Sequence, residues 1–193
     1  MRKICVYCSS SAKIAPLYFD ATAKLAELLV ADGWEIVFGG GSLGLMGKLA
    51  DVALANGGKV RGIMPKFMQE VEWAHTGVED FIFTESMHEW KAQLLADTDA
   101  LVALPGGTGT LEELFEAITL KRLGLYLKPI VILNTNGFYQ PLKEMLEKCV
   151  SEKFMSDRNL QAWRFVDHPE DVLPAIADMP DWDANAISFA AMR

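Results

Sequence analysis

The stretch GGGSLGLMG at residues 39–47 follows the apolar run Glu35–Phe38 and opens a segment of helical spacing at 45–52. A second glycine-rich stretch, PGGTGT at 105–110, stands in the same place after the apolar run 100–104. Strand, glycine loop and helix in that order are typical of parallel sheets that bind ligands at the carboxyl ends of their strands. The two loops therefore indicate the fold class and the candidate site together.

The same alternation of short apolar runs and helical segments extends outward from these loops in both directions. The apolar runs predict strands at 4–8, 35–38, 60–64, 81–84, 100–104, 129–133 and 163–166. Helical spacing predicts helices at 17–31, 45–52, 87–96, 110–123, 139–153 and 169–177. Because most of the runs are apolar throughout, both faces of the sheet should be covered by helices. We expect one α/β domain over residues 1–180, a Rossmann-like doubly wound parallel sheet, and a tail at 181–193 without an assigned role.

Composition excludes several function classes. The chain has 193 residues, 18 Lys plus Arg against 26 Asp plus Glu, and a net charge of -8. That balance argues against a protein that coats nucleic acid or an anionic membrane. No run approaches the ~18 apolar residues of a membrane span. Three cysteines make no disulfide framework, and Cys5 and Cys8 should point to opposite faces of a strand. We therefore expect a cytoplasmic protein with no metal site.

Glycine in the two loops lets backbone amides approach a ligand, and a helix N-terminus adds partial positive charge. This is a local device for binding phosphate in an acidic protein. Gly39, Gly41 and Gly44 satisfy GxGxxG, but they follow the second strand and no acid ends the next one, so a dinucleotide is not favoured. A P-loop fails because Ser42 replaces its first glycine and Leu49 its Ser or Thr.

Acidic residues follow the second loop. Glu112, Glu113 and Glu116 lie within two turns of a loop suited to phosphate, where negative charge is costly unless it has a function. Locally, Thr110 to Glu113 fits a capping box, which is the favoured interpretation on spacing alone. Upstream, Met87, Trp90 and Leu94 have core spacing, whereas His88 and Lys91 share another helix face. That pair either contacts a ligand or is a solvated surface pair.

These motifs together resemble one family. CVYCSSS at 5–11, GGGSLGLMG at 39–47, IMP at 63–65, MHEWK at 87–91 and PGGTGTLEE at 105–113 are similar to the successive motifs of the Lonely Guy family. Its members are cytokinin riboside 5'-monophosphate phosphoribohydrolases, long mislabelled as lysine decarboxylases. The resemblance implies hydrolysis of the N-glycosidic bond of a purine nucleoside 5'-monophosphate, with AMP or a cytokinin riboside monophosphate as substrate. It also implies a homodimer, for which the apolar helix 111–126 is a candidate contact, and no organic cofactor.

The resemblance also implies roles for individual residues. The catalytic residues fall on Glu113 and Lys91, with Glu113 handling the water and the charge of the sugar. Lys91, and His88 where it reaches the ligand, would offset the charge of the phosphate or of the leaving group. A carboxylate there fits the chemistry, because glycosidic cleavage passes through an oxocarbenium-like sugar. The substrate-binding residues are expected to be Ser10, Gly41, Ser42, Glu72, Met87, His88, Gly106, Gly107, Thr108, Gly109, Thr110 and Glu112.

One departure from the family pattern concerns the catalytic motif. The family's MHxRK motif carries an arginine that works with the glutamate, and Trp90 occupies that position. Tryptophan supplies neither the charge nor the forked donors of arginine. A non-catalytic carrier of a nucleotide or phospho-ligand on the same fold is therefore the alternative. A decarboxylase would need a lysine that holds pyridoxal phosphate, and the sequence nominates none.

Overall fold

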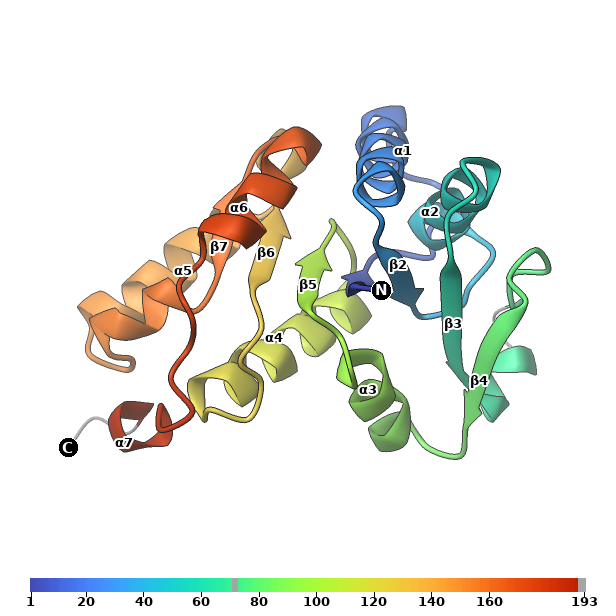
Figure 1. Ribbon diagram of the computed structural model, residues 1–193. Coiled ribbons are helices and arrows are strands. Elements are labelled where there is room, and N and C mark those ends of the chain that lie inside the picture. Colours follow the sequence, from blue (N-terminus) through green and yellow to red (C-terminus); the bar gives the residue numbers. More distant parts are fainter. Residues whose placement is uncertain (71–72, 191–193) are drawn as a thin grey trace.

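The computed structural model describes residues 1–70 and 73–190 and contains one 7-stranded sheet (Figure 1). The strands are β1 (Lys3–Tyr7), β2 (Glu35–Phe38), β3 (Val60–Pro65), β4 (Asp80–Thr84), β5 (Ala100–Ala103), β6 (Ile130–Leu133) and β7 (Arg164–Val166). The α-helices are α1 (Pro16–Ala31), α2 (Gly44–Ala55), α3 (Met87–Leu95), α4 (Thr108–Arg122), α5 (Gln140–Ser151), α6 (Val172–Asp178) and α7 (Ile187–Ala190). All predicted strands are present, most within one residue of their expected ends.

The strand order is β4-β3-β2-β1-β5-β6-β7, and every neighbouring pair is parallel. The chain builds one half of the sheet outward from β1, then returns to the other side of β1 with β5. This reversal is the topological switch point of a doubly wound sheet, and it confirms the predicted fold class. Ligands bind such sheets in the crevice beyond the carboxyl ends of the strands that flank the switch point.

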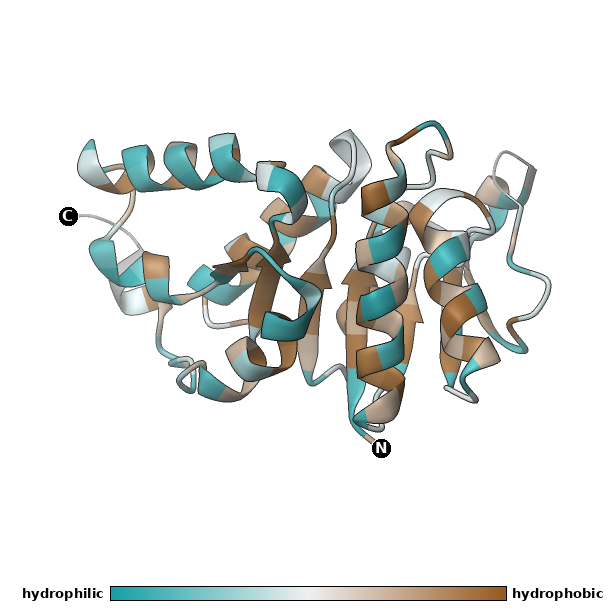
Figure 2. Ribbon diagram, turned by 90° about the horizontal axis from the view of Figure 1, so that it is seen from above, coloured by the Kyte–Doolittle hydropathy of each residue, from teal (hydrophilic) through white to brown (hydrophobic). Residues whose placement is uncertain are grey.

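Side chains alternate along the central strands between two separate apolar clusters. On one face, Ile4 and Val6 of β1 pack with α1, α2 and α6. On the other face, Cys5 and Tyr7 pack with α3, α4 and α5. Figure 2 shows the apolar strands lying beneath the helices of one face. Cys8 belongs to the first cluster and Cys5 to the second, which confirms that the two thiols point to opposite faces.

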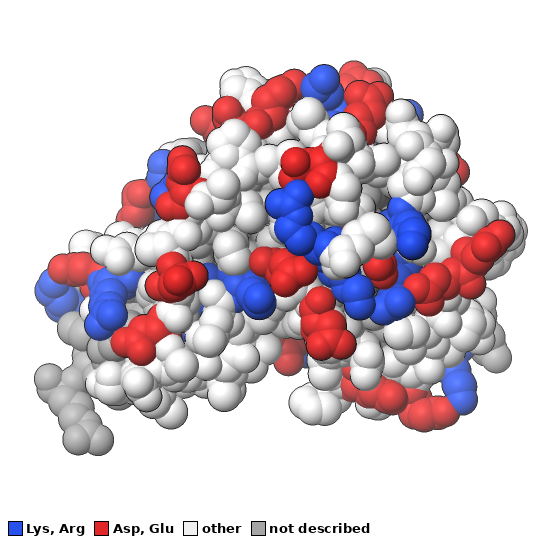
Figure 3. All heavy atoms as spheres, in the orientation of Figure 1, with Lys and Arg blue, Asp and Glu red and all other residues white. Residues whose placement is uncertain are grey.

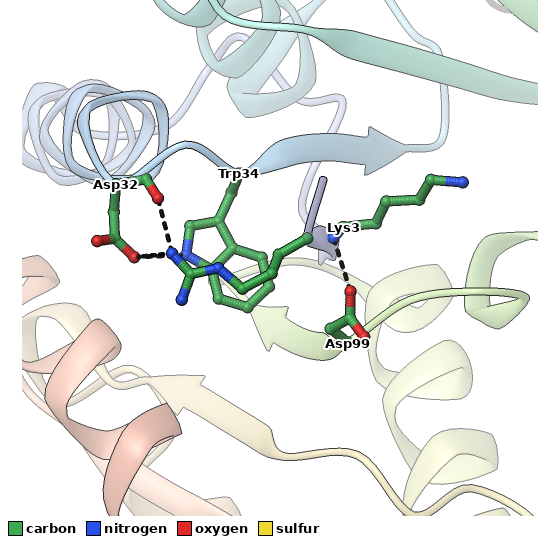
Figure 4. Close-up of polar contacts among 5 residues, drawn as sticks. Lys3, Asp32, Trp34 and Asp99 are labelled. Atoms are coloured by element: carbon green, nitrogen blue, oxygen red, sulfur yellow. Dashed lines mark hydrogen bonds and ion pairs between the residues drawn. The ribbon is translucent and has the colours of Figure 1, made fainter.

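The amino end of β1 is held by acidic side chains that lie just before the two neighbouring strands, β2 and β5 (Figure 4). The Arg2 guanidinium lies 4.5 Å from the centre of the Trp34 ring and donates to the Asp32 carboxylate at 2.7 Å. The Lys3 amide donates to the Asp99 carboxylate at 3.0 Å. On this side of the molecule, basic side chains gather near the N-terminus and are bordered by acidic ones (Figure 3). None of the described helices is both long and apolar enough to cross a membrane.

The segment after Pro180, which the sequence left without a role, packs against the end of α4. Trp182 and Ala186 are buried in the cluster on the α4 face. The indole N–H of Trp182 donates to the Lys121 carbonyl at 2.6 Å, and the Lys121 ammonium lies 5.6 Å from the centre of that ring. Lys121 is almost fully buried, and its ammonium donates to the Lys128 carbonyl at 2.5 Å. Burial lowers the pKa of Lys121 to about 8.

Candidate active site

A cavity of about 420 Å³ opens at the carboxyl edge of the sheet, across the switch point. Its lining comes from the loop after β1, from the end of β2, from β3 and the 3-10 helix Lys66–Glu70 that follows it, and from α2, α3 and α4. Residues 9–11 and 107–110 contribute polar groups, whereas Met46, Met64, Met68 and Trp90 contribute apolar ones. The cavity therefore has a polar part over β1 and β5 and an apolar part over β2 and β3.

The N-terminus of α4 forms the polar end of the cavity. Gly107 is the N-cap residue, so no side chain covers the first amides of the helix. A Cβ added at Gly107 or Gly109 would meet nothing within 4 Å, so the space beside this backbone is open to a ligand. At Gly106 a Cβ would lie 2.1 Å from Oγ1 of Thr110, so this glycine is required by packing. The arrangement suits an anion at a helix N-terminus.

The helix start corrects one expectation. Because α4 begins at Thr108 and not at Thr110, Thr110 lies inside the first turn and Glu113 lies in the second. Thr110 is therefore not the N-cap of α4, and the capping box predicted from TLEE is wrong. A related arrangement occurs at α3, where the Ser86 hydroxyl accepts from the Glu89 amide at 3.2 Å and Glu89 accepts from the Glu85 amide at 2.9 Å. Glycine at an N-cap leaves no side-chain signal in the sequence.

The first glycine-rich loop differs from the expectation that both loops present open amides. The Leu45 and Met46 amides at the start of α2 donate to the Ser9 carbonyl at 2.8 and 3.3 Å. The Ser42 amide donates to the Trp73 carbonyl at 2.9 Å. These amides are occupied by backbone, and Gly44, at φ +62°, allows the approach because a Cβ would lie 2.4 Å from the Ser10 carbonyl carbon. The start of α2 is therefore held against the loop that follows β1 by these hydrogen bonds.

Glu113 lines the cavity and is 9% exposed. Around it, Cys5 and Tyr7 project from β1 into the same layer as α4. Burial raises the pKa of Cys5 and of Tyr7 well above their usual ranges, and the charge of Glu113 adds to both shifts. These groups therefore stay protonated at neutral pH beside a largely buried carboxyl group that faces the cavity. A carboxyl group in such a place is a candidate for proton transfer.

Lys91 joins α3 to α4 through two ion pairs. Its ammonium lies 2.6 Å from a Glu112 carboxylate oxygen and 2.7 Å from one of Glu116. Hydrogen bonds to these two carboxylates raise the pKa of Lys91. Lys91 thus offsets two of the three acids beside the α4 N-terminus, while Glu113 faces the cavity. The Lys91 ammonium is therefore paired with carboxylates of the protein itself.

Trp90 of α3 lines the cavity as well as packing against the core, so the core interpretation of its spacing is only part of its role. Its indole N–H donates to the Ile63 carbonyl of β3 at 2.7 Å. His88, on the same helix, is exposed and lies outside the described cavity lining.

The structure brings many of the expected site residues together. Those that line the cavity are Ser10, Met87, Gly107, Thr108, Gly109, Thr110, Glu112 and Glu113. Gly41, Ser42, His88, Lys91 and Gly106 lie outside its described lining. Glu72 lies outside the described residues. Met46, Met64 and Met68 also line the cavity and were not predicted as site residues. Met46 and Met64 lie in the quoted motifs at 39–47 and 63–65, whereas Met68 lies in none.

The described part of the chain contains no cluster of His, Cys, Asp and Glu that could hold a metal ion. The described cavity lining also contains no lysine that could form a Schiff base with pyridoxal phosphate. The arrangement instead offers open amides for an anion, a partly enclosed carboxyl group and an apolar wall with one aromatic ring. These features suit a small phosphorylated molecule that carries a flat, apolar group.

Comparisons with known proteins add a family to this geometry. A family model described as "Possible lysine decarboxylase" matches residues 46–176. Cytokinin riboside 5'-monophosphate phosphoribohydrolase LOG2 of Arabidopsis thaliana is 42% identical over 155 residues, which cover 80% of this chain and 73% of the relative. LOG1 of the same plant, which carries the same activity in its name, is 36% identical over 199 residues, covering 98% of this chain and 93% of the relative.

Solved structures show the same fold at lower identity. The molybdenum cofactor carrier protein MCP from Chlamydomonas reinhardtii has a TM-score of 0.70 and 21% identity, covering 92% of this chain and 97% of that one. The molybdenum cofactor binding protein from Rippkaea orientalis has a TM-score of 0.69 and 21% identity, with 91% and 95% covered. At this identity the likeness shows a shared fold alone.

Proposed function

The chain belongs to the family described as possible lysine decarboxylases, which includes its cytokinin riboside 5'-monophosphate phosphoribohydrolase relatives, and we propose that it hydrolyses the N-glycosidic bond of a purine nucleoside 5'-monophosphate. The products would be the free base and ribose 5-phosphate. The observation that carries this proposal is the position of Glu113, a largely buried carboxyl group in a cavity whose polar end is an uncovered helix N-terminus.

The arrangement supports a direct hydrolysis. The 5'-phosphate would lie against the amides of 107–110, where the partial charge of α4 favours an anion. The carboxylate of Glu113 would accept a proton from water as the water oxygen bonds to C1' of the ribose and the bond from C1' to the base nitrogen breaks. The departing base carries away the electron pair and takes up a proton from solvent, and Glu113 then returns the proton it accepted to solvent. The negative charge of Glu113 would also stabilise the oxocarbenium-like sugar.

Other residues support the site in different ways. Ser10, Met87 and Glu112 line the cavity and are proposed to contact the substrate directly. Gly41, Ser42 and Gly106 would shape the loops around it, and Lys91 would hold the acids beside Glu113 in place. His88 would act only if the substrate extends toward the exposed face of α3. Glu72, expected from the resemblance, remains a proposed contact.

The test is to incubate the protein with AMP and measure adenine and ribose 5-phosphate, with Glu113→Gln as the matched variant. Glutamine has nearly the same shape but accepts no proton at neutral pH, so hydrolysis should fall ~100-fold or more while folding and AMP binding stay nearly unchanged. Brisk hydrolysis that survives this substitution would refute the role of Glu113. Tight AMP binding with no hydrolysis by the native protein would instead support a nucleotide carrier. A screen of base release over nucleoside monophosphates would then identify the preferred base.

Two further proposals concern the setting of the protein. We place it in the cytoplasm, because three cysteines, an odd number, make no disulfide framework in a chain that can bury a core of this size. We also propose a homodimer with contacts along α4 and the residues that follow it. Ile118 and Tyr126 are buried within the chain, so the exposed apolar side chains available for contact there are Phe115, Leu125 and Leu127.

A further inference from the structure

The end of the cavity away from α4 has an unusual composition. Met46 comes from α2, Met64 from β3, Met68 from the 3-10 helix after β3, and Met87 and Trp90 from α3. In the sheet order, β3 lies three places from β5. A ligand whose phosphate lies at the N-terminus of α4 therefore extends across β1 and β2 toward this apolar wall. The group that lies there is the one farthest from the phosphate.

The orientation of Trp90 is fixed by the sheet. Its only polar atom, the indole nitrogen, donates to the Ile63 carbonyl at 2.7 Å. A Cβ on Gly39 would lie 3.5 Å from Cζ2 of Trp90 and 3.2 Å from the sulfur of Met46. Gly39, in the first glycine-rich motif, therefore leaves space for Trp90 and Met46. Other residues of this motif use their amides to donate to backbone carbonyls. Trp90 offers the cavity a ring surface with no further hydrogen-bond donor.

We propose that Trp90 is a specificity-determining residue that holds the base of the nucleotide by contact with its ring. The inference rests on the proposed function in one respect, that a nucleoside monophosphate occupies the cavity. Aromatic rings stack on any base, and the contact grows with the flat area of the base, so a purine should be preferred over a pyrimidine. Methionine side chains adapt to irregular shapes, so the surrounding wall would follow the outline of the base.

The test measures binding separately from hydrolysis by using the Glu113→Gln variant. AMP, UMP and ribose 5-phosphate are titrated by calorimetry, and indole fluorescence is recorded in the same samples. AMP should bind about tenfold or more tightly than ribose 5-phosphate, with UMP between them, in line with typical base stacking on aromatic side chains. AMP should quench the indole fluorescence, and ribose 5-phosphate should not.

Substitutions then assign the effect to one ring. Trp90→Leu in the Glu113→Gln background should weaken AMP about tenfold and leave ribose 5-phosphate unchanged, whereas Trp90→Phe should keep most of the preference for AMP. Trp73→Leu is the matched control, because Trp73 is 74% exposed and lies outside the described cavity lining, and it should change neither affinity. If Trp90→Leu does not fold, Trp90→Phe still tests the proposal, because it keeps an aromatic ring at 90 but should remove the quenching by AMP; quenching that persists in Trp90→Phe would overturn the contact.

The outcomes separate this inference from the proposed function. Equal affinity for AMP and ribose 5-phosphate, or equal losses for both ligands in Trp90→Leu, would overturn the role of Trp90 even if the native protein releases adenine. If the native protein releases no adenine from AMP, the proposed hydrolysis is refuted. The role of Trp90 would still be supported if AMP is preferred and Trp90→Leu abolishes that preference.

Discussion

Replacing Gly107 by valine tests whether the α4 N-terminus binds phosphate. Gly107 has φ -83° and ψ -158°, an extended conformation that valine adopts without strain. A Cβ at this position meets no protein atom within 4 Å, so the new side chain would project into open space. Valine is a poorer N-cap residue than glycine, at a cost of about 1 kcal/mol. For a chain of this size that corresponds to a fall in Tm of about 2–4 °C.

The effect on binding should be much larger than the effect on folding. In the native protein, AMP should bind more tightly than adenosine by about 2–4 kcal/mol, the value of a few charge-assisted hydrogen bonds to phosphate. This is roughly a 30- to 1000-fold ratio of dissociation constants. Valine at 107 would hold the phosphate away from the amides, so the ratio should fall toward one. Calorimetric titration of both ligands into both proteins gives the comparison.

A contrasting substitution separates blocking from misfolding. Gly106→Ala should destabilise the fold, because its Cβ would lie 2.1 Å from Oγ1 of Thr110. Gly107→Val should instead unfold within a few degrees of the native protein. Equal affinities of AMP and adenosine for the native protein would refute the placement of the phosphate, and so would a well-folded Gly107→Val protein that retains the native ratio.

Three further predictions concern stability and assembly. The pKa of Lys121 in the folded protein, about 8, lies below its ordinary 10.5, so the unfolded state binds more protons between these two pH values. The free energy of unfolding measured in urea should therefore rise with pH across that interval, and Lys121→Met should flatten the rise. Trp182→Ala should lower the free energy of unfolding by about 3–5 kcal/mol in urea, because it removes a buried aromatic side chain, and a loss below 1 kcal/mol would show that the C-terminal segment is dispensable. Sedimentation at micromolar concentration should report a dimer that Leu125→Glu weakens, Leu125 being 71% exposed, and a monomeric native protein would remove the proposed contact.

The central strands could be predicted closely because burial on both faces makes their sequences apolar throughout. The runs at 35–38 and 60–64 are bounded by turn residues, and β2 and β3 begin and end within one residue of them. The start of α4 was misplaced by two residues because Gly107 caps the helix without a side chain. Trp182 could not be assigned, since its partner Lys121 lies 61 residues earlier and a buried lysine gives no apolar signal.

The candidate site was predictable where it depends on local sequence. The open amides of 107–110 follow from glycine at a helix N-terminus, and Glu113 follows from its distance to that loop. The occupied amides of the first loop could not be foreseen, because their acceptors, the carbonyls of Ser9 and Trp73, come from other loops. The apolar wall of the cavity could not be predicted either, because its methionines come from four separate elements: Met46, Met64, Met68 and Met87.

The central position of β1 has a consequence for how the chain folds during synthesis. The first strand made is paired on one side by β2, whose residues from Glu35 to Phe38 follow soon after it. Its other side waits for β5, whose partner positions run from Ala100 to Ala103. Until those residues leave the ribosome, a strand that is buried in the finished sheet has an unpaired edge, and such edges recruit strands from other chains. Translation pauses before residues 100–103 have left the ribosome would therefore favour aggregation.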